Sequence, residues 1–290
     1  MFEHAFVRLP VRTAPPWDGF RGRTGRAGPD KEPGGAARTV HLVPFTGSHP
    51  AAALLLVRTP LPASALVVGS MTPDLPYYLP FSPGWPTHAV MAVGSIDVLL
   101  GLAAWLAWHG LLAAPAVAFA PDRLRARLVD RVEIGLRSRL GSARQVLLLL
   151  LALAVGAGTH VLWDEFTHPN RWGTEHLSVL ASTWGGIEGY RWLQHGSGLA
   201  GAAALTVWLL LWWRRTEPVP VRARPAAPWL WAGLLVVGAI AGSTAAVAAP
   251  TLRSAGFDGA TRGGAAVLLA AVVLALAWHF DQRADRPEPS

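Results

Sequence analysis

The stretch Leu147–Asn170 reads LLLLLALAVGAGTHVLWDEFTHPN and joins a long apolar run to a row of ionisable side chains. An apolar run of this length predicts a helix that crosses a membrane. His160, Asp164 and His168 follow at four-residue steps, so they share one face of that helix and drift by about 40° per step. A bilayer penalises such groups unless they are paired, hydrated or metal-bound. The row is therefore a candidate functional site.

The composition of the whole chain indicates a polytopic membrane protein. The 290 residues are 52% hydrophobic and 15% charged, with a mean hydropathy of +0.33, which is too apolar for an ordinary soluble domain. There is no cysteine, so a disulfide framework and a thiolate metal site are excluded. The net charge of +7 comes from arginines between apolar runs, where membrane topology requires them. We therefore expect membrane lipid, and no nucleic acid, as a partner.

Long apolar runs define the expected fold class, an all-α polytopic membrane helical bundle with about five full spans. Two shorter runs, 48–58 and 63–72, are separated by Arg58 and two prolines. They predict either a bent single span or a short helical hairpin inserted from one side. The five long runs cover about 89–112, 144–167, 195–213, 229–250 and 263–280.

The chain divides into three parts by composition. Residues 1–39 are rich in Pro, Gly and Arg and lack an apolar period, so they predict a disordered extension. Residues 40–282 form the expected membrane helical domain, and residues 283–290 form a tail.

Loop charges predict which ends of the spans face outward. Arginines concentrate from Arg123 to Arg144 and from Arg214 to Arg224. We expect the protein to lie in the plasma membrane, and the positive-inside rule places both loops on its cytoplasmic side. His49 joins the outer face only if residues 48–72 form a hairpin, which the convergence of ligands therefore favours. The candidate ligands that converge on the outer face are Asp74, His88, His160, Asp164, His168 and His195.

The first candidate motif pairs Asp74 with His88, fourteen residues later. Pro73 ends the preceding helix, so Asp74 emerges in a fixed turn with its carboxylate free, and a carboxylate in a rigid loop is suited to bridging two divalent cations. The alternative is that Asp74 caps a turn and His88 caps the next helix.

The second motif is the row of His160, Asp164 and His168. Two ligands at i and i+4 can hold one metal ion, and the acid between the histidines can bridge a second. The chain lacks H-E-x-x-H, so a zincin protease is not indicated. The alternative is a set of hydrogen-bonded groups that pack helices together. His195 opens the third span as a further ligand or as an interfacial residue, and Asp97 lies inside the first span.

Five segments, in this order, carry a resemblance to a known family. The chain resembles a group of bacterial membrane proteins, the domain of unknown function 4184 family, over roughly residues 41–250. That family has no established activity, so the resemblance implies a topology and a residue set rather than a reaction. The segments are VPFTGSHPAAALLL (43–56), LVVGSMTPDLPYYL (66–79), THAV (87–90), THVLWDEFTHP (159–169) and LQHGSG (193–198).

A more distant likeness suggests a chemistry. The order of candidate ligands is similar to that of zinc-dependent phospholipase C and of membrane-bound metal-dependent hydrolases. That order is an early His, then an Asp-x13-His pair, then His-x3-Asp. This likeness implies that His49 ligates one ion. It implies a central site made of Asp74, His88, His160 and Asp164.

The chain departs from the phospholipase pattern near its end. His168 matches only loosely, and His195 has Leu199 four residues on, where the pattern has an acid. The likeness leaves open whether another residue substitutes there or whether only one or two ions bind. The candidate substitutes are Glu175, His176 and Glu188.

The main functional hypothesis is a membrane-embedded hydrolase that depends on a divalent metal, zinc, and acts on a lipid or lipid-linked phosphoester at the outer face. Asp74 would be a bridging ligand and the candidate catalytic base. One alternative is a transporter or channel with ionisable groups distributed along its depth, to which Asp97 points. Another is a structural protein with a metal site.

Overall fold

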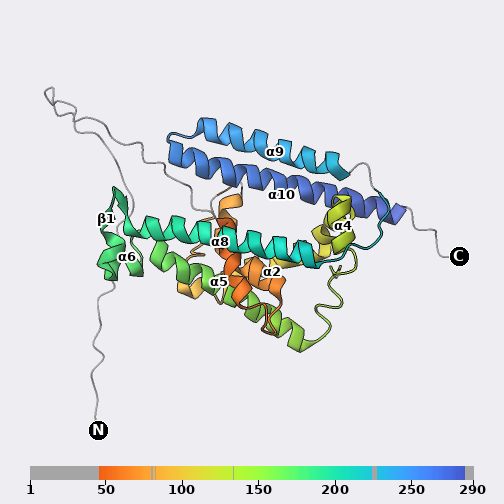
Figure 1. The fold of residues 1–290 in the computed structure, drawn as a ribbon, viewed down its shortest axis with the longest axis horizontal. Helices are drawn as coiled ribbons and strands as arrows, with labels where there is room; N and C mark the ends of the chain where they lie inside the picture. The colour runs from red at the N-terminus through yellow and green to blue at the C-terminus, as the bar shows by residue number, and fades with distance from the viewer. Residues whose placement is uncertain (1–45, 80, 82, 133, 224–226, 285–290) are drawn as a thin grey trace, which may run out of the picture. The chain divides into compact units, whose positions relative to one another are not determined.

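The computed structural model describes residues 46–79, 81, 83–132, 134–223 and 227–284, so the predicted extension over 1–39 and most of the predicted tail lie outside the described residues. The described chain is helical almost throughout (Figure 1), with one short antiparallel pair, β1 (Thr183–Trp184) and β2 (Ile187–Glu188). The short 3₁₀ and π segments are η1 (Thr46–Leu55), η2 (Thr72–Tyr78), η3 (Val90–Ala92) and η4 (Trp108–Leu112). The α-helices are α1 (Ala63–Met71), α2 (Ile96–Ala107), α3 (Ala113–Ala118), α4 (Asp122–Leu128), α5 (Ala143–Thr167), α6 (Trp172–His176), α7 (Ser178–Ala181), α8 (Gly189–Arg215), α9 (Ala227–Ala248) and α10 (Leu252–Ala284).

Five helical segments are long and apolar enough to cross a membrane, which confirms the predicted all-α polytopic fold. The first begins at Ile96 rather than at the predicted residue 89, because the start of that run forms the separate short η3. Other segments extend beyond the predicted runs, because helical hydrogen bonding continues into the residues that flank an apolar stretch. The segments are Ile96–Ala118, Ala143–His176, Gly189–Arg215, Pro228–Ala248 and Ser254–Gln282.

The two short apolar runs form a helical hairpin. Thr59 N donates to Leu56 O at 3.0 Å in the turn after η1, and α1 then packs back against η1. Pro50 lies inside η1, which winds as a 3₁₀ helix; in a regular α-helix its ring would clash with the carbonyl four residues earlier. The hairpin returns the start of η1 to the end of α1, so that His49 and Asp74 line one cavity.

Two glycines let α1 lie backbone to backbone against α5. A Cβ on Gly69 would collide with the carbonyl oxygen of Leu153, and a Cβ on Gly156 would lie 2.7 Å from the amide nitrogen of Ser70. Buried Leu66, Leu149, Leu153 and Trp105 surround this contact as a hydrophobic core. Glycine is needed at both positions because any side chain would push the helices apart.

The remaining spans attach to this core in two ways. Helix α8 packs on η1, whereas α9 contacts α10 extensively, and α10 reaches the rest of the bundle through η2, η4 and α3. The α9–α10 contact is also glycine-based: a Cβ on Gly263 would lie 2.8 Å from the carbonyl oxygen of Gly238. In lipid, where apolar burial drives no association, such close approach supplies the packing contacts between helices.

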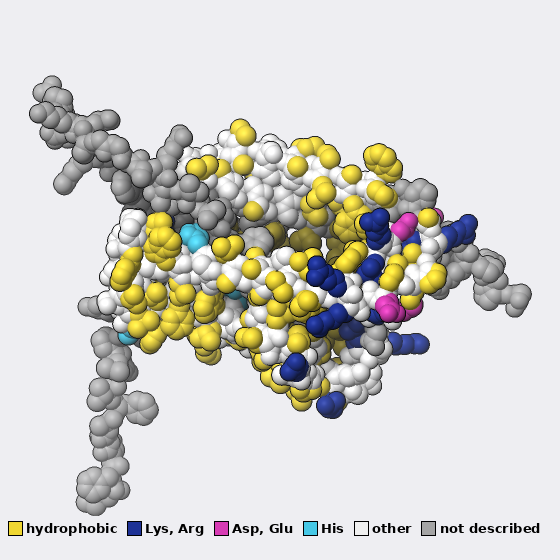
Figure 2. Space-filling model, in the orientation of Figure 1, with side chains coloured by type: hydrophobic (Ala, Val, Ile, Leu, Met, Phe, Trp, Pro, Cys, Tyr) yellow, Lys and Arg dark blue, Asp and Glu magenta, His cyan; other side chains and the backbone are white. Residues whose placement is uncertain are grey.

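The arginine-rich loops gather at one end of the described bundle, over α4 and the end of α8 (Figure 2). The guanidinium of Arg127 lies 4.1 Å from the ring centre of Trp213, and Val219 N donates to Ala126 O at 2.8 Å. Arg144 begins α5 and Asp164 lies near its end, about 30 Å away at 1.5 Å per residue. The positive charge and the His/Asp row therefore occupy opposite ends of the same helix.

Candidate metal centre

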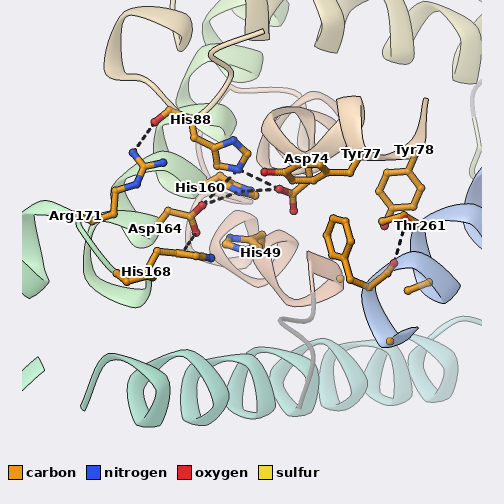
Figure 3. A pocket seen from close by; sticks show the side chains of 15 residues that line it. His49, Asp74, Tyr77, Tyr78, His88, His160, Asp164, His168, Arg171 and Thr261 are labelled. Carbon is orange, nitrogen blue, oxygen red and sulfur yellow. Dashed lines mark hydrogen bonds and ion pairs between the residues drawn. The ribbon is translucent and has the colours of Figure 1, made fainter. Parts of the chain in front are cut away.

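Four segments that are far apart in the sequence meet at one cavity of about 630 Å³. Asp74 comes from η2, His88 from the loop before η3, and both His160 and Asp164 from the last turns of α5, while His49 comes from η1. Figure 3 shows these side chains directed toward one another. The central site expected from the sequence is thus brought together.

Two acids and two histidines alternate around the centre. Asp74 Oδ1 lies 3.1 Å from His88 Nε2 and 3.6 Å from His160 Nε2, and Asp164 Oδ2 lies 3.5 Å and 3.4 Å from the same two nitrogens. Ligands placed about 2.0–2.2 Å from a tetrahedral ion stand about 3.4 Å apart. The four observed separations are close to that value, but the four residues divide between two three-residue ligand sets that share His160, one of which includes His49.

A backbone contact fixes which nitrogen of His160 faces the centre. Its Nδ1 lies 2.7 Å from the carbonyl oxygen of Ser70, and both groups are buried. Because a carbonyl only accepts, Nδ1 carries the proton, and in the neutral ring Nε2 presents its lone pair to the two carboxylates. Metal-ligating histidines are typically held in this way, with the other ring N–H bonded to a carbonyl.

Thr87 holds His88 in the same sense. The Thr87 hydroxyl donates to the carbonyl oxygen of Pro73 at 2.7 Å, and its oxygen lies 3.3 Å from His88 Nδ1. With its own proton committed, the hydroxyl can only accept from Nδ1–H, which again leaves Nε2 for the centre. The contact also ties the His88 loop to the proline that precedes Asp74.

Asp164 is a buried acid that lies beside imidazole rings. Its side chain is 5% exposed, its Oδ2 faces His88 and His160, and its Oδ1 lies 3.3 Å from His168 Nδ1. A buried carboxylate is stabilised by such partners or by a cation. Among the described residues, two sets of side chains could each hold a metal ion, because the ligand atoms within each set lie within 4.8 Å of one another. One set is His49, His160 and Asp164, and the other is Asp74, His88 and His160.

Comparison with known protein families identifies the family of this chain. The sequence profile of the family described as domain of unknown function (DUF4184) matches residues 43–280. The chain belongs to the DUF4184 family. The match extends beyond the resemblance seen over residues 41–250 and includes most of α10. No curated protein and no solved structure matches the chain.

His49 completes the wall of the centre in this DUF4184 protein. Its ring stacks on that of His160, with centroids 3.9 Å apart and planes at 16°. Burial, followed by the neighbouring His160, lowers the pKa of His49 to about 4. His49 is therefore neutral near pH 7, as a ligating imidazole must be.

The structure does not bring His168 or His195 into either ligand set among the described residues. Helix α5 ends at Thr167, and His168 takes an extended conformation (φ −127°, ψ 152°), although its side chain still lines the cavity beside Asp164. His168 Nδ1 lies 3.3 Å from Asp164 Oδ1, and its Nε2 lies 3.2 Å from Gln194 Nε2. On α8, Gln194 thus meets the row at His168.

The cavity includes residues that the sequence pattern did not single out. Tyr77 and Arg171 flank the centre, and Phe257 and Thr261 bring α10 to it (Figure 3). Burial, and then the carboxylates of Asp74 and Asp164, raise the pKa of the Tyr77 hydroxyl above its usual range, so it stays a proton donor. Tyr77 follows Asp74 by three residues, and Arg171 follows His168 by three residues. This short spacing from the two motifs is the sequence feature by which they could have been predicted.

Proposed function

We propose that this DUF4184 protein is a zinc-dependent hydrolase that acts on a lipid or lipid-linked phosphoester at the outer face of the plasma membrane. The single observation that carries the proposal is the ring of alternating acid and imidazole atoms at 3.1–3.6 Å. Nitrogen and oxygen ligands without cysteine suit zinc among the common divalent ions. The two carboxylates would neutralise its double charge.

The residues would divide the chemistry of hydrolysis between them. Asp74, His88, His160 and Asp164 would hold the ion, with His49 beside them. Bound zinc supplies a Lewis acid that polarises a phosphoryl oxygen and lowers the pKa of water. Asp74 would accept a proton as water adds to phosphorus and would pass it to the leaving oxygen as the ester P–O bond breaks, so that a neutral alcohol is released. The protonated Tyr77 hydroxyl lies on the same cavity and is placed to donate a hydrogen bond to the reacting group.

The charge distribution supports an outward-facing centre. The arginine-rich loops over α4 and the end of α8 gather at one end of the bundle (Figure 2), and the positive-inside rule assigns such an end to the cytoplasm. A lipid substrate fits this position, because the helices that bear the cavity, α5 and α10, are themselves candidate membrane spans.

Metal content of the purified full-length chain tests the proposal. We expect stoichiometric zinc in the wild type, and its loss in His160→Ala and in Asp164→Asn, which keeps the side-chain volume. His176→Ala is the matched control, because His176 is exposed at the same end of the bundle and bonds Trp172 O at 2.9 Å. Wild-type protein without bound metal, or the same content in all variants, would refute the metal centre. Turnover is then measured as phosphorus release from phospholipid mixed micelles.

A cation or proton path is the second candidate, and one buried residue favours it. Asp97 in α2 is 1% exposed, and neither of its carboxylate oxygens has a hydrogen-bond partner among the described residues. Intramembrane acids of this kind mark ion pathways. Flux into proteoliposomes that is abolished by Asp97→Asn but survives Asp74→Asn would support the path over the hydrolase.

A further inference from the structure

Arg171 is brought over the metal centre by a turn at the end of α5. Asn170 adopts a left-handed conformation (φ 55°), which asparagine tolerates better than most residues. The turn reverses the chain, so that the Arg171 side chain lines the same cavity as the acids and histidines. Figure 3 shows its guanidinium beside His88 and Asp164.

Only part of the Arg171 guanidinium is used by the protein. Nη1 donates to the carbonyl oxygen of His88 at 3.0 Å and to Glu165 Oε1 at 3.1 Å. Nε and Nη2 make no hydrogen bond to the described residues, and the side chain is 32% exposed. Two fixed contacts thus orient a planar fork whose other donors remain for a ligand. Such forks match the geometry of phosphate oxygens.

The opposite wall of the cavity is apolar and belongs to a span. Phe257 of α10 meets Tyr77 edge to face, with ring centroids 5.3 Å apart, and Ala260 continues the wall. A ligand that fills about 630 Å³ between these residues and Arg171 has an anionic end and an apolar end. A phosphorylated lipid has both.

We propose that Arg171 is the anion-binding residue of this cavity and that its ligand is a phosphate ester, with the phosphoryl group held between the guanidinium and the His/Asp centre. The inference rests on the proposed function, because two unneutralised carboxylates would repel a phosphate. The same phosphoryl chemistry occurs in free phosphate and in a lipid headgroup. The apolar wall favours the lipid.

Calorimetric titration of the zinc-loaded full-length chain in dodecyl maltoside tests the assignment, with inorganic phosphate in one arm and phosphatidic acid in mixed micelles in the other. We expect Arg171→Gln to weaken both by about tenfold to a hundredfold, the usual worth of charge-assisted hydrogen bonds. Tighter binding of phosphatidic acid than of inorganic phosphate would assign the lipid, whereas equal binding would assign the free anion to the same residue.

Glu165→Gln separates anion binding from a structural salt bridge. Glu165 competes for Arg171 and also accepts from Trp172 N at 3.0 Å, a contact that glutamine retains. If Arg171 binds the anion, then Glu165→Gln tightens phosphate binding while Arg171→Gln weakens it. Arg191→Gln is the matched control, because Arg191 pairs with Glu188 outside the cavity.

Three results would overturn the inference while the proposed function stands. The first is zinc-loaded Arg171→Gln that binds phosphate as tightly as the wild type. The second is weaker phosphate binding in both Arg171→Gln and Glu165→Gln, and the third is loss of zinc from Arg171→Gln. Either of the last two would give Arg171 the role of holding the His88 loop. Wild-type protein that binds no zinc would overturn the proposed function, and this inference with it.

Discussion

Replacement of Gly156 by alanine tests whether the close approach of α1 and α5 sets the metal affinity. The added Cβ would collide with the carbonyl oxygen of Leu66 and would lie 2.7 Å from Ser70 N, whereas ordinary contact begins at 3.4 Å. The helices must therefore separate locally by about 0.7 Å to clear Ser70 N and by more to clear Leu66 O, because interiors have no free volume to absorb the overlap. All the nearest atoms are backbone, so a side-chain rotation cannot relieve it.

That separation acts directly on the ligand His160. The bond from His160 Nδ1 to Ser70 O is 2.7 Å, and the same displacement would bring it to about 3.4 Å, where hydrogen bonds weaken steeply. Loss of such a supporting bond typically lowers metal affinity by about 10- to 100-fold. Overpacking would also destabilise the fold by about 1–3 kcal/mol, offset by about 1 kcal/mol from the better helix propensity of alanine.

Gly158→Ala is the matched control on the same helix. Its Cβ would meet Val93 Cγ1 at 3.6 Å, an ordinary contact, so it gains helix propensity without a clash. Zinc affinity is measured by competition with a chromophoric chelator, and stability by thermal unfolding in detergent. Equal zinc affinity in the two variants would show that the α1–α5 contact does not position the centre.

Two further predictions concern the histidines. We expect the zinc content of His168→Gln to stay within a fewfold of the wild type and that of His160→Gln to fall to background, because His168 lies outside both ligand sets. Metal analysis of the purified variants checks this, and loss of zinc from both would make His168 a ligand. In the metal-free protein, His49 binds a proton more weakly when folded, with its pKa near 4, than when unfolded, near 6.5. The unfolded state then binds more protons between these values, so stability should fall as pH drops from about 6.5 to 4. His49→Phe, which retains an aromatic ring against His160, should flatten this fall in the unfolding temperature, and an unchanged slope would contradict the assigned shift.

The spans and the core of the site were predictable because their signals are local. Apolar runs long enough to cross a bilayer indicate helices wherever they pack. Pro73 lies at the start of η2, so Asp74 lies in a 3₁₀ helix with its carboxylate 3.1 Å from His88 rather than in a turn with a free carboxylate. A four-residue step places His160 and Asp164 on one face. The resemblance to the DUF4184 family carried the same residues. Neither signal could choose between a span and a hairpin for residues 48–72, because that choice depends on what η1 and α1 pack against.

His168 shows the limit of periodicity. The four-residue spacing does place it against Asp164, at 3.3 Å, but α5 ends one residue before it and it belongs to neither ligand set among the described residues. On α8, Gln194 Nε2 lies 3.2 Å from His168 Nε2, a contact that the spacing alone did not indicate. Where a helix ends and how it is rotated are set by packing, which the pattern of residue types does not encode.

By itself, the sequence determined the class of the protein and the residues able to bind a metal, since hydrophobic length, proline placement and helical spacing act within one segment. Tertiary structure alone decided the ligand geometry. Gly69 and Gly156 bring Ser70 O to His160, Thr87 orients His88, and α10 closes the cavity from nearly a hundred positions after the α5 row. These contacts join residues distant along the chain, and the physical reason that they form is close packing of backbones, which no local pattern specifies.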